Sequence, residues 1–349
     1  MKRYTFLAMA GAAVGALVGA EYYLRRHNHA TNRDRWFHEE YDGAHPYIVF
    51  HNRSGWELMP GYSVAGIRIN DCGFRGAEIQ RKKDPSVVRI MCIGDSCTFG
   101  APGEDSPYPS QLERELGKME LENVCQVINA GVDDHSTINA QLRLPRLLAF
   151  EPDVLIVYIG WNDMWMGNPK QYPDMRRKTR SYWHYGNGGD TGLRLLDEAK
   201  EILELNTPPP IGSFALEDFQ PTNFEYNLRR LIRNAKNNRV RVVLTTLPTL
   251  ISANGDSSSI QNIEKLRFPS FFAQGDVDRL TKLYDIYDAS IRRMAMEEDT
   301  DLVDLNNVFA GMDGERNRYF SDTWHPTIEG SQVIAQTLAR GLHERNIVG

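Results

Sequence analysis

Five residues of this 349-residue chain could together carry out nucleophilic catalysis: Ser96, Gly131, Asn162, Asp322 and His325. The first three lie within three residues of the end of an apolar run, and the last two stand three residues apart before a helical pattern. A serine hydroxyl becomes a nucleophile when a histidine takes its proton, and a carboxylate orients that histidine. Asn and Gly can supply the N–H donors that stabilise an oxyanion. These residue types therefore predict a serine nucleophile, its base and an oxyanion hole.

The elements that must position these residues alternate between strands and amphipathic helices. Buried-type strands are predicted at residues 87–93, 124–129, 154–159, 240–247 and 302–305. Helices are predicted around residues 112–119, 138–142, 193–205, 224–235, 280–294 and 334–342. This alternation predicts a flavodoxin-like three-layer α/β/α fold with a mainly parallel five-stranded sheet. Functional residues of such sheets gather at the carboxyl ends of the strands, which is where the five candidates fall.

Two further segments flank or interrupt this pattern. Residues 27–85 contain short aromatic and β-branched runs between Asn, Gly and Pro, which predicts a linker and a small β-rich lead-in. Residues 164–220 are rich in Pro, Gly, Asn and aromatic side chains, and so long an insertion is usually a lid, a binding loop or a disordered excursion. We therefore predict one catalytic domain over residues 86–345 with an insertion at 164–220.

The order of these blocks resembles that of the SGNH (GDSL-type) hydrolase superfamily, over roughly residues 86–345. Its four blocks are matched by Ser96 in Gly-Asp-Ser, Gly131, Asn162 and His325. Cys97 stands where a bulkier apolar residue is usual, a change that concerns packing beside the nucleophile.

The resemblance implies a mechanism for the candidate residues. An ester would transfer its acyl group to Ser96 and then to water, with His325 as base and later acid, and Asp322 orienting His325. The oxyanion donors would be the backbone N–H groups of Ser96 and Gly131 and the side-chain amide of Asn162. A side chain at position 131 would crowd the oxyanion.

Each residue taken alone also has an ordinary structural interpretation. Ser96 could cap a helix, Asn162 could belong to a turn, and His325 could simply precede the last helix. Asp95 and Asp163 belong to the motifs but are interpreted as structural.

The remaining candidates for ligand chemistry make no recognisable site. The other histidines, among them His135 and His184, show no metal-ligand spacing and are interpreted as surface residues. The four cysteines likewise match no metal site and leave disulfides open. No cofactor is expected, and a net charge of −6 argues against a nucleic-acid partner.

The first 35 residues carry a different charge from the rest. They hold six basic and two acidic residues, which leaves 34 basic and 44 acidic residues in the remainder. Lys2 and Arg3 precede an apolar run over residues 4–20, so residues 1–26 are predicted to be a membrane anchor or a signal peptide cleaved after Ala20. We expect a cell-envelope protein, either anchored with an exported catalytic domain or secreted after cleavage.

The most direct prediction is a serine esterase acting on a small-molecule, lipid or glycan ester. The alternatives are a polysaccharide O-acetyl esterase or O-acyltransferase of the cell envelope, and a catalytically inactive membrane-tethered scaffold. Trp161, Trp165 and Trp324 could stack on a sugar, line an acyl pocket or fill space beneath a lid. The sequence predicts neither the acyl length nor the oligomeric state.

Overall fold

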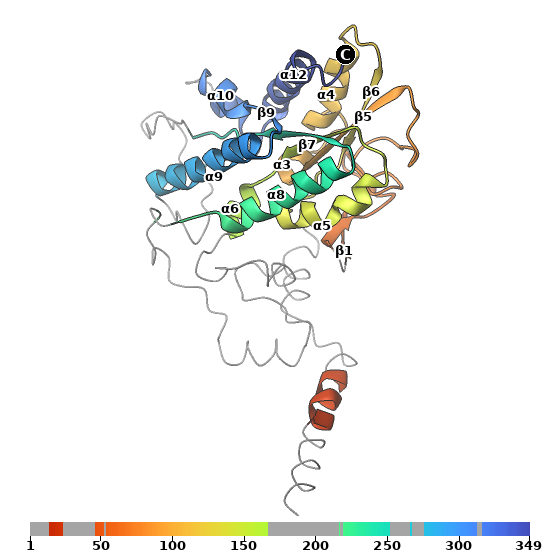
Figure 1. Ribbon diagram of the computed structural model, residues 1–349, viewed down its shortest axis with the longest axis vertical. Helices are drawn as coiled ribbons and strands as arrows, with labels where there is room; N and C mark the ends of the chain where they lie inside the picture. The colour runs from red at the N-terminus through yellow and green to blue at the C-terminus, as the bar shows by residue number, and fades with distance from the viewer. Residues whose placement is uncertain are drawn as a thin grey trace, which may run out of the picture. The chain divides into compact units, whose positions relative to one another are not determined.

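The computed structural model describes residues 14–23, 46–51, 54–166, 219–251, 276–312 and 316–349, together with Leu216 and Leu266. The chain divides into two compact units, one of Met1–Pro46 with Lys170–Pro209 and the other of Tyr47–Pro169 with Pro210–Gly349. Residues 14–23 of the first unit form a helix. The second unit contains every strand and helix named below (Figure 1). The domain boundaries expected from the sequence stay a prediction.

A five-stranded parallel sheet forms the centre of the second unit. Its strands are β5 (Val87–Gly94), β6 (Val124–Asn129), β7 (Val154–Tyr158), β8 (Arg241–Thr245) and β9 (Asp301–Val303), in the order β6-β5-β7-β8-β9. Each lies within two residues of its predicted bounds, which confirms the predicted fold. This is the flavodoxin-like order, in which the connections diverge between the first and third strands, here β5 and β7.

Helices cover both faces of this sheet (Figure 1). Helices α4 (Tyr108–Gly117) and α12 (Ile328–Glu344) pack together on one face, and α5 (Thr137–Leu148), α8 (Thr222–Asn237) and α9 (Val277–Glu297) lie on the other. Each turns one apolar side to the sheet, as the periodicity predicted. Four helices of four to six residues were not predicted, because so short a segment shows no helical period: α3 (Ser96–Phe99), α6 (Trp161–Met166), α10 (Leu305–Ala310) and α11 (Arg316–Tyr319).

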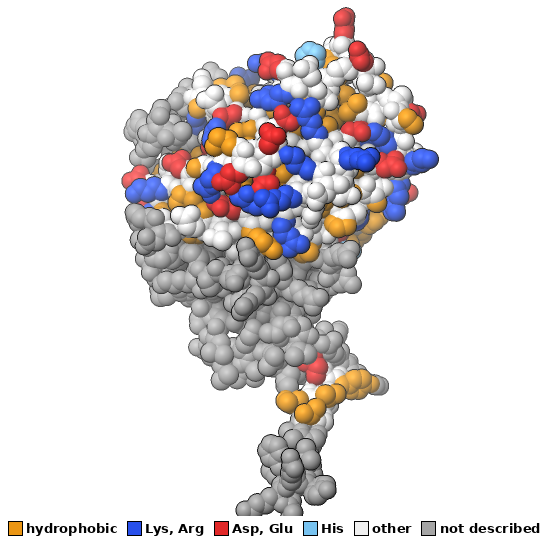
Figure 2. Space-filling model, in the orientation of Figure 1, with side chains coloured by type: hydrophobic (Ala, Val, Ile, Leu, Met, Phe, Trp, Pro, Cys, Tyr) orange, Lys and Arg blue, Asp and Glu red, His pale blue; other side chains and the backbone are white. Residues whose placement is uncertain are grey.

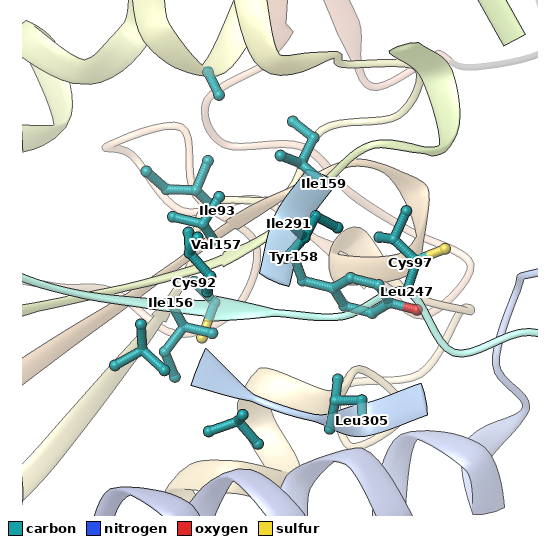
Figure 3. Packing of buried hydrophobic residues seen from close by; sticks show 14 of the residues in the cluster. Cys92, Ile93, Cys97, Ile156, Val157, Tyr158, Ile159, Leu247, Ile291 and Leu305 are labelled. Carbon is teal, nitrogen blue, oxygen red and sulfur yellow. The ribbon is translucent and has the colours of Figure 1, made fainter. Parts of the chain in front are cut away.

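The core lies between these layers. Strand β7 reads Val-Leu-Ile-Val-Tyr and is buried along its whole length, as expected for a strand covered on both faces. Figure 3 shows Ile156 and Val157 of β7 beside their sheet neighbours Cys92 and Ile93 of β5, with Tyr158 farther along, toward Cys97 and Leu247. All four cysteines are free thiols, and Cys92 serves as a small apolar side chain in this core.

The predicted β-rich lead-in is confirmed as two small antiparallel pairs. These are β1 (Ile48–His51) with β2 (Gly55–Leu58), and β3 (Ser63–Val64) with β4 (Ile67–Arg68). Strand β2 is joined to α5 by a buried ion pair between Glu57 and Arg143, with Arg146 as a second partner. Burial favours the neutral form of Glu57, but Arg143 and further contributions that include Arg146 and a hydrogen bond from Ser54 outweigh it and lower the pKa of Glu57 to about 2.

Charges on the outer face of α8 and α9 are interspersed rather than segregated (Figure 2). Arg229 pairs with Glu297, and Arg233 pairs with Glu298 at 2.8 Å. The Arg229–Glu297 pair and the Arg233 side chain are partly or largely exposed, whereas the Glu298 side chain is only 7% exposed. Partly exposed pairs add little to stability, so this face is interpreted as a solvated surface.

Several predictions fall largely outside the described residues. The helix expected at residues 193–205 lies outside them, as does most of the insertion at 164–220. Of the apolar run at residues 4–20, only residues 14–20 are described, and they are helical. No helix in the described ranges combines the length and the apolar character needed to cross a membrane.

Candidate active site

Ser96 is the first residue of α3, directly after the carboxyl end of β5. Asp95 caps this short helix, since its Oδ1 accepts the N–H of Cys97 at 2.9 Å. The side chain of Asp95 is fully buried, and burial raises its pKa to about 7. The Ser96 Oγ lies 2.7 Å from Nε2 of His325. The structure therefore brings together the expected nucleophile and base, which are 229 positions apart in the chain.

His325 is oriented by Asp322. Its Nδ1 lies 2.7 Å from Oδ2 of Asp322, whose Oδ1 accepts the backbone N–H groups of His325 and Trp324. Burial alone would raise the pKa of Asp322, but the hydrogen bonds from His325 and the backbone outweigh it and hold the pKa below its usual range. An ionised Asp322 accepts the Nδ1 proton, which leaves the Nε2 lone pair to accept the Ser96 hydroxyl proton. This is the tautomer that a general base requires.

Gly131 lies close to α3, but the structure gives a different reason for its lack of a side chain. A Cβ at this position would lie 2.3 Å from the backbone nitrogen of Phe99 and 2.7 Å from the carbonyl carbon of Thr98. A side chain at position 131 would therefore crowd the helix that carries Ser96, whereas the sequence predicts crowding of the oxyanion. The Gly131 N–H donates to Oδ1 of Asn129 at 3.0 Å, and Asn129 in turn donates to the Thr98 carbonyl.

Asn162 is the second residue of α6, at the carboxyl end of β7. Its Nδ2 donates to the backbone carbonyl of His135 at 3.0 Å. The expectation that His135 is a surface residue is wrong, because its side chain is only 1% exposed. The lead-in covers it: the ring lies against Trp56, with 5.4 Å between ring centroids. Burial, aided by the charge of Arg143, lowers the pKa of His135 to about 3.

Asp163 occupies the start of α6 and is bonded to the start of α5. Its carboxylate accepts the N–H of Thr137 at 2.9 Å and the hydroxyl of the same residue at 2.5 Å. Burial raises the pKa of Asp163 to about 7. These contacts fit the structural interpretation of Asp163, because they join two helix ends rather than reach toward Ser96.

Arg75 is a supporting residue that the sequence did not reveal. Its guanidinium donates to the carbonyls of Phe99, Gly100, Ala101 and Gly103, which form the end of α3 and the loop after it. It also stacks on the Phe99 ring at 4.5 Å. A cation is favourable at the carboxyl end of a helix. An isolated arginine after the short strand β4 carries no sequence signal of such a role.

An aromatic stack lies beside the base. The Trp161 ring stacks on Trp324 at 5.3 Å and on Tyr284 at 5.8 Å. Trp161 and Trp324 are buried, so these two rings fill space in the core next to His325. The third tryptophan, Trp165, has a side chain outside the described part of the chain.

The described residues contain no group of three or more His, Cys, Asp or Glu side chains that could hold a metal ion.

The hydrogen-bonded series of Asp322, His325 and Ser96 lies at the carboxyl ends of strands in a flavodoxin-like sheet, and the comparison with known families assigns the class of protein. The chain belongs to the GDSL-like lipase/acylhydrolase family, whose model matches residues 92–333. No curated protein matches the chain.

Solved structures of similar fold include three bacterial or metagenomic proteins. Axe2, an acetylxylan esterase from Geobacillus stearothermophilus, is 19% identical, with 73% of this chain and 93% of that chain covered and a TM-score of 0.45. LAE5, an α/β hydrolase from the metagenome of Lake Arreo in Spain, is 17% identical, with 73% and 95% covered and a TM-score of 0.47. A GDSL-like lipase from Bacteroides thetaiotaomicron is 15% identical, with 74% and 89% covered and a TM-score of 0.43.

Proposed function

We propose that this chain is a serine esterase that hydrolyses a carboxylic ester through an acyl-Ser96 intermediate. The observation that carries the proposal is the continuous hydrogen-bonded series from Asp322 through His325 to Ser96, with 2.7 Å at both links. Membership of the GDSL-like lipase/acylhydrolase family supports the same class of chemistry.

The reaction follows from the tautomer of His325. Ser96 Oγ forms a bond to the acyl carbon while its proton passes to Nε2 of His325. The tetrahedral oxyanion collapses, the bond to the alcohol oxygen breaks, and His325 gives its proton to the leaving alcohol. Water then attacks acyl-Ser96 by the same steps, releasing the carboxylic acid and restoring the serine. Asp322 stays ionised throughout and stabilises the imidazolium form of His325.

The oxyanion of the tetrahedral intermediate needs donors already in place. The Ser96 N–H is suited to this, because the first N–H groups of a helix have no acceptor within it. Asn162 uses its Nδ2 toward His135, and an amide nitrogen carries a second hydrogen for the substrate. Gly131 contributes only if its N–H is shared with, or released from, Asn129. One such donor is typically worth about 10²–10³ in rate.

The direct test is labelling of the full-length protein by a fluorophosphonate probe. The native protein should be labelled, and Ser96→Ala should remain folded and unlabelled. Absence of labelling in native protein that is shown to be folded would remove the enzyme proposal and leave the inactive scaffold. Esterase activity that survives in Ser96→Ala would remove Ser96 as the nucleophile.

The substrate is best approached with a panel of esters. Acetylated sugars, lysophospholipids and aryl esters cover the glycan, lipid and small-molecule classes. Release of acetate from acetylated glycan, with short aryl esters left untouched, would favour the polysaccharide O-acetyl esterase. Transfer of acetyl to a glycan acceptor rather than to water would favour the O-acyltransferase. The buried state of Trp161 and Trp324 gives no support to a sugar-stacking role for these two rings.

We also propose, on the sequence of residues 1–26, that the catalytic domain is exported to the cell envelope. The basic start and the apolar run support the proposal, and Val14, Leu17 and Val18 of the helix at 14–23 are exposed. Fusing residues 1–40 to a reporter enzyme that is active only in the periplasm tests it. An active fusion is expected, and an inactive fusion would contradict export.

A further inference from the structure

His135 is a buried histidine whose ring and backbone carbonyl make hydrogen bonds to two other parts of the molecule. It lies in the loop between β6 and α5, and its Nε2 is 3.1 Å from the backbone carbonyl of Trp56. A carbonyl oxygen only accepts, so Nε2 must carry the proton. In a neutral ring Nδ1 is then unprotonated, and within the described residues it has no hydrogen-bond partner. Because burial lowers the pKa of His135 to about 3, the ring is neutral near pH 7 and donates its one ring proton to the lead-in.

The lead-in holds the same loop at further points. Trp56 donates its Nε1 to the carbonyl of Asp133 at 2.8 Å, and the hydroxyl of Tyr47 donates to Oδ2 of Asp133 at 2.6 Å. All of these groups are buried. The family model begins at residue 92, so Tyr47 and Trp56 lie outside the region that it matches. The lead-in thus holds, from outside the region that the family model matches, a loop that Gly94 and Asn162 also hold from within that region.

The other side of this loop meets the amide of Asn162. The His135 carbonyl accepts one hydrogen of Asn162 Nδ2 at 3.0 Å. An amide group is planar, so fixing one N–H also fixes the direction of the second N–H and of the oxygen. A displacement of about 1 Å at a reacting centre can cost about 10²-fold in rate. The position of the His135 carbonyl consequently sets where Asn162 can place its remaining hydrogen.

We propose that His135 is a positioning residue for Asn162, which it holds in the geometry for oxyanion binding by linking the lead-in at Trp56 to the start of α6. This inference rests on the proposed esterase function. No hydrogen bond joins His135 to Ser96 in the described part of the chain, and the proposed effect of His135 passes through the backbone carbonyl that Asn162 binds.

A matched pair of substitutions separates the hydrogen bond from the packing. Gln and Met have similar length and volume, but only Gln can donate to the Trp56 carbonyl. In the full-length protein we expect His135→Met to lower kcat by about 10- to 100-fold, with a smaller change in KM. His135→Gln should stay within about threefold of the wild type, since Gln can restore the hydrogen bond. Equal losses in the two variants would overturn the proposal.

A double-mutant cycle then tests whether His135 acts through Asn162. Asn162→Ala should lower kcat by about 10²–10³. Once the amide is gone its position no longer matters, so the double variant His135→Met/Asn162→Ala should match Asn162→Ala within about twofold. A double variant slower by the product of the two single losses would show an independent, merely structural effect and would contradict the proposal.

Folding and the proposed function are monitored separately. Thermal unfolding reports the fold of each variant, and fluorophosphonate labelling reports Ser96 itself. If His135→Met does not fold, His135→Leu takes its place in the cycle, because Leu also has no donor for the Trp56 carbonyl. An unlabelled wild type would defeat the esterase proposal, whereas a labelled wild type with multiplicative losses would defeat only the role of His135.

Discussion

Ser96 and Asn162 follow two neighbouring strands of one sheet, yet contacts of different range hold them in place. On the Ser96 side, Asp95 caps the helix that Ser96 begins, and Asp322 binds a histidine three residues away. On the Asn162 side, the amide depends on the loop at His135, and that loop is bonded to Trp56, 79 positions earlier. The base and the start of the helix that carries Ser96 are thus supported from within their own motifs, although Arg75 of the lead-in holds the end of that helix. The proposed oxyanion amide is supported by the lead-in through the loop at His135.

This difference suggests how the site tolerates change. When the supporting residues belong to the motif itself, a short sequence block is enough to specify the position of the functional side chain. Support from a distant segment depends on the packing of that segment, so the same motif can be held differently in another chain. The oxyanion side should therefore respond to substitutions far from it, and the base should respond mainly to its own neighbours.

The largest effect is expected at the base. Asp322→Asn removes the charge that holds the Nδ1 proton and allows His325 to adopt the wrong tautomer, so kcat should fall by about 10⁴-fold. The measurement is steady-state hydrolysis of the best ester in the panel, with thermal unfolding as the check on folding. A loss below about tenfold in a folded protein would show that His325 does not depend on Asp322.

A substitution in the lead-in should lower the free energy of unfolding. Glu57→Gln leaves Arg143 buried without its counter-charge, which should cost about 3–5 kcal/mol in urea unfolding at pH 7. The folded pKa of Glu57, about 2, lies below its ordinary value of 4.5, so the ionised pair stabilises the fold above that value. The gap between wild type and variant should therefore narrow as pH falls from about 4.5 toward 2.

A surface pair provides the control for this measurement. Glu329 pairs with Arg318, and both side chains are more than half exposed. Glu329→Gln should leave the urea midpoint nearly unchanged at every pH. Equal effects of the Glu57 and Glu329 substitutions would contradict the importance of the lead-in contact.

A smaller loss of stability is expected at Gly131, where the backbone after β6 packs against α3. Gly131→Ala places a Cβ against the backbone of α3, which should cost about 1–3 kcal/mol and displace the helix that carries Ser96. Gly117→Ala is the control, because a Cβ at Gly117 has no atom within 4 Å. If both substitutions leave urea unfolding unchanged, the close approach of Gly131 to α3 is not a constraint on the fold.

The sequence predicted the parts of this molecule whose determinants are local. Strand β7 is a continuous apolar run, β5 and β6 are predominantly apolar, and the polar residues after the three strands mark the candidate site. It mispredicted His135 as a surface residue, because nothing near it in the sequence shows that the distant Trp56 packs against its ring. It also missed the role of Arg75, whose four carbonyl partners lie 24 to 28 positions further along the chain. Contacts of this kind depend on tertiary packing and leave no period or motif in the sequence.

The central claim is that Ser96 carries the acyl group. The most direct measurement is to stop the reaction of the full-length protein with p-nitrophenyl acetate by acid within its first turnovers and map the acetylated peptide by mass spectrometry. The account predicts acetyl on Ser96 in the wild type and none at that position in Ser96→Ala. Ester hydrolysis by the wild type with acetyl found on another residue would contradict it.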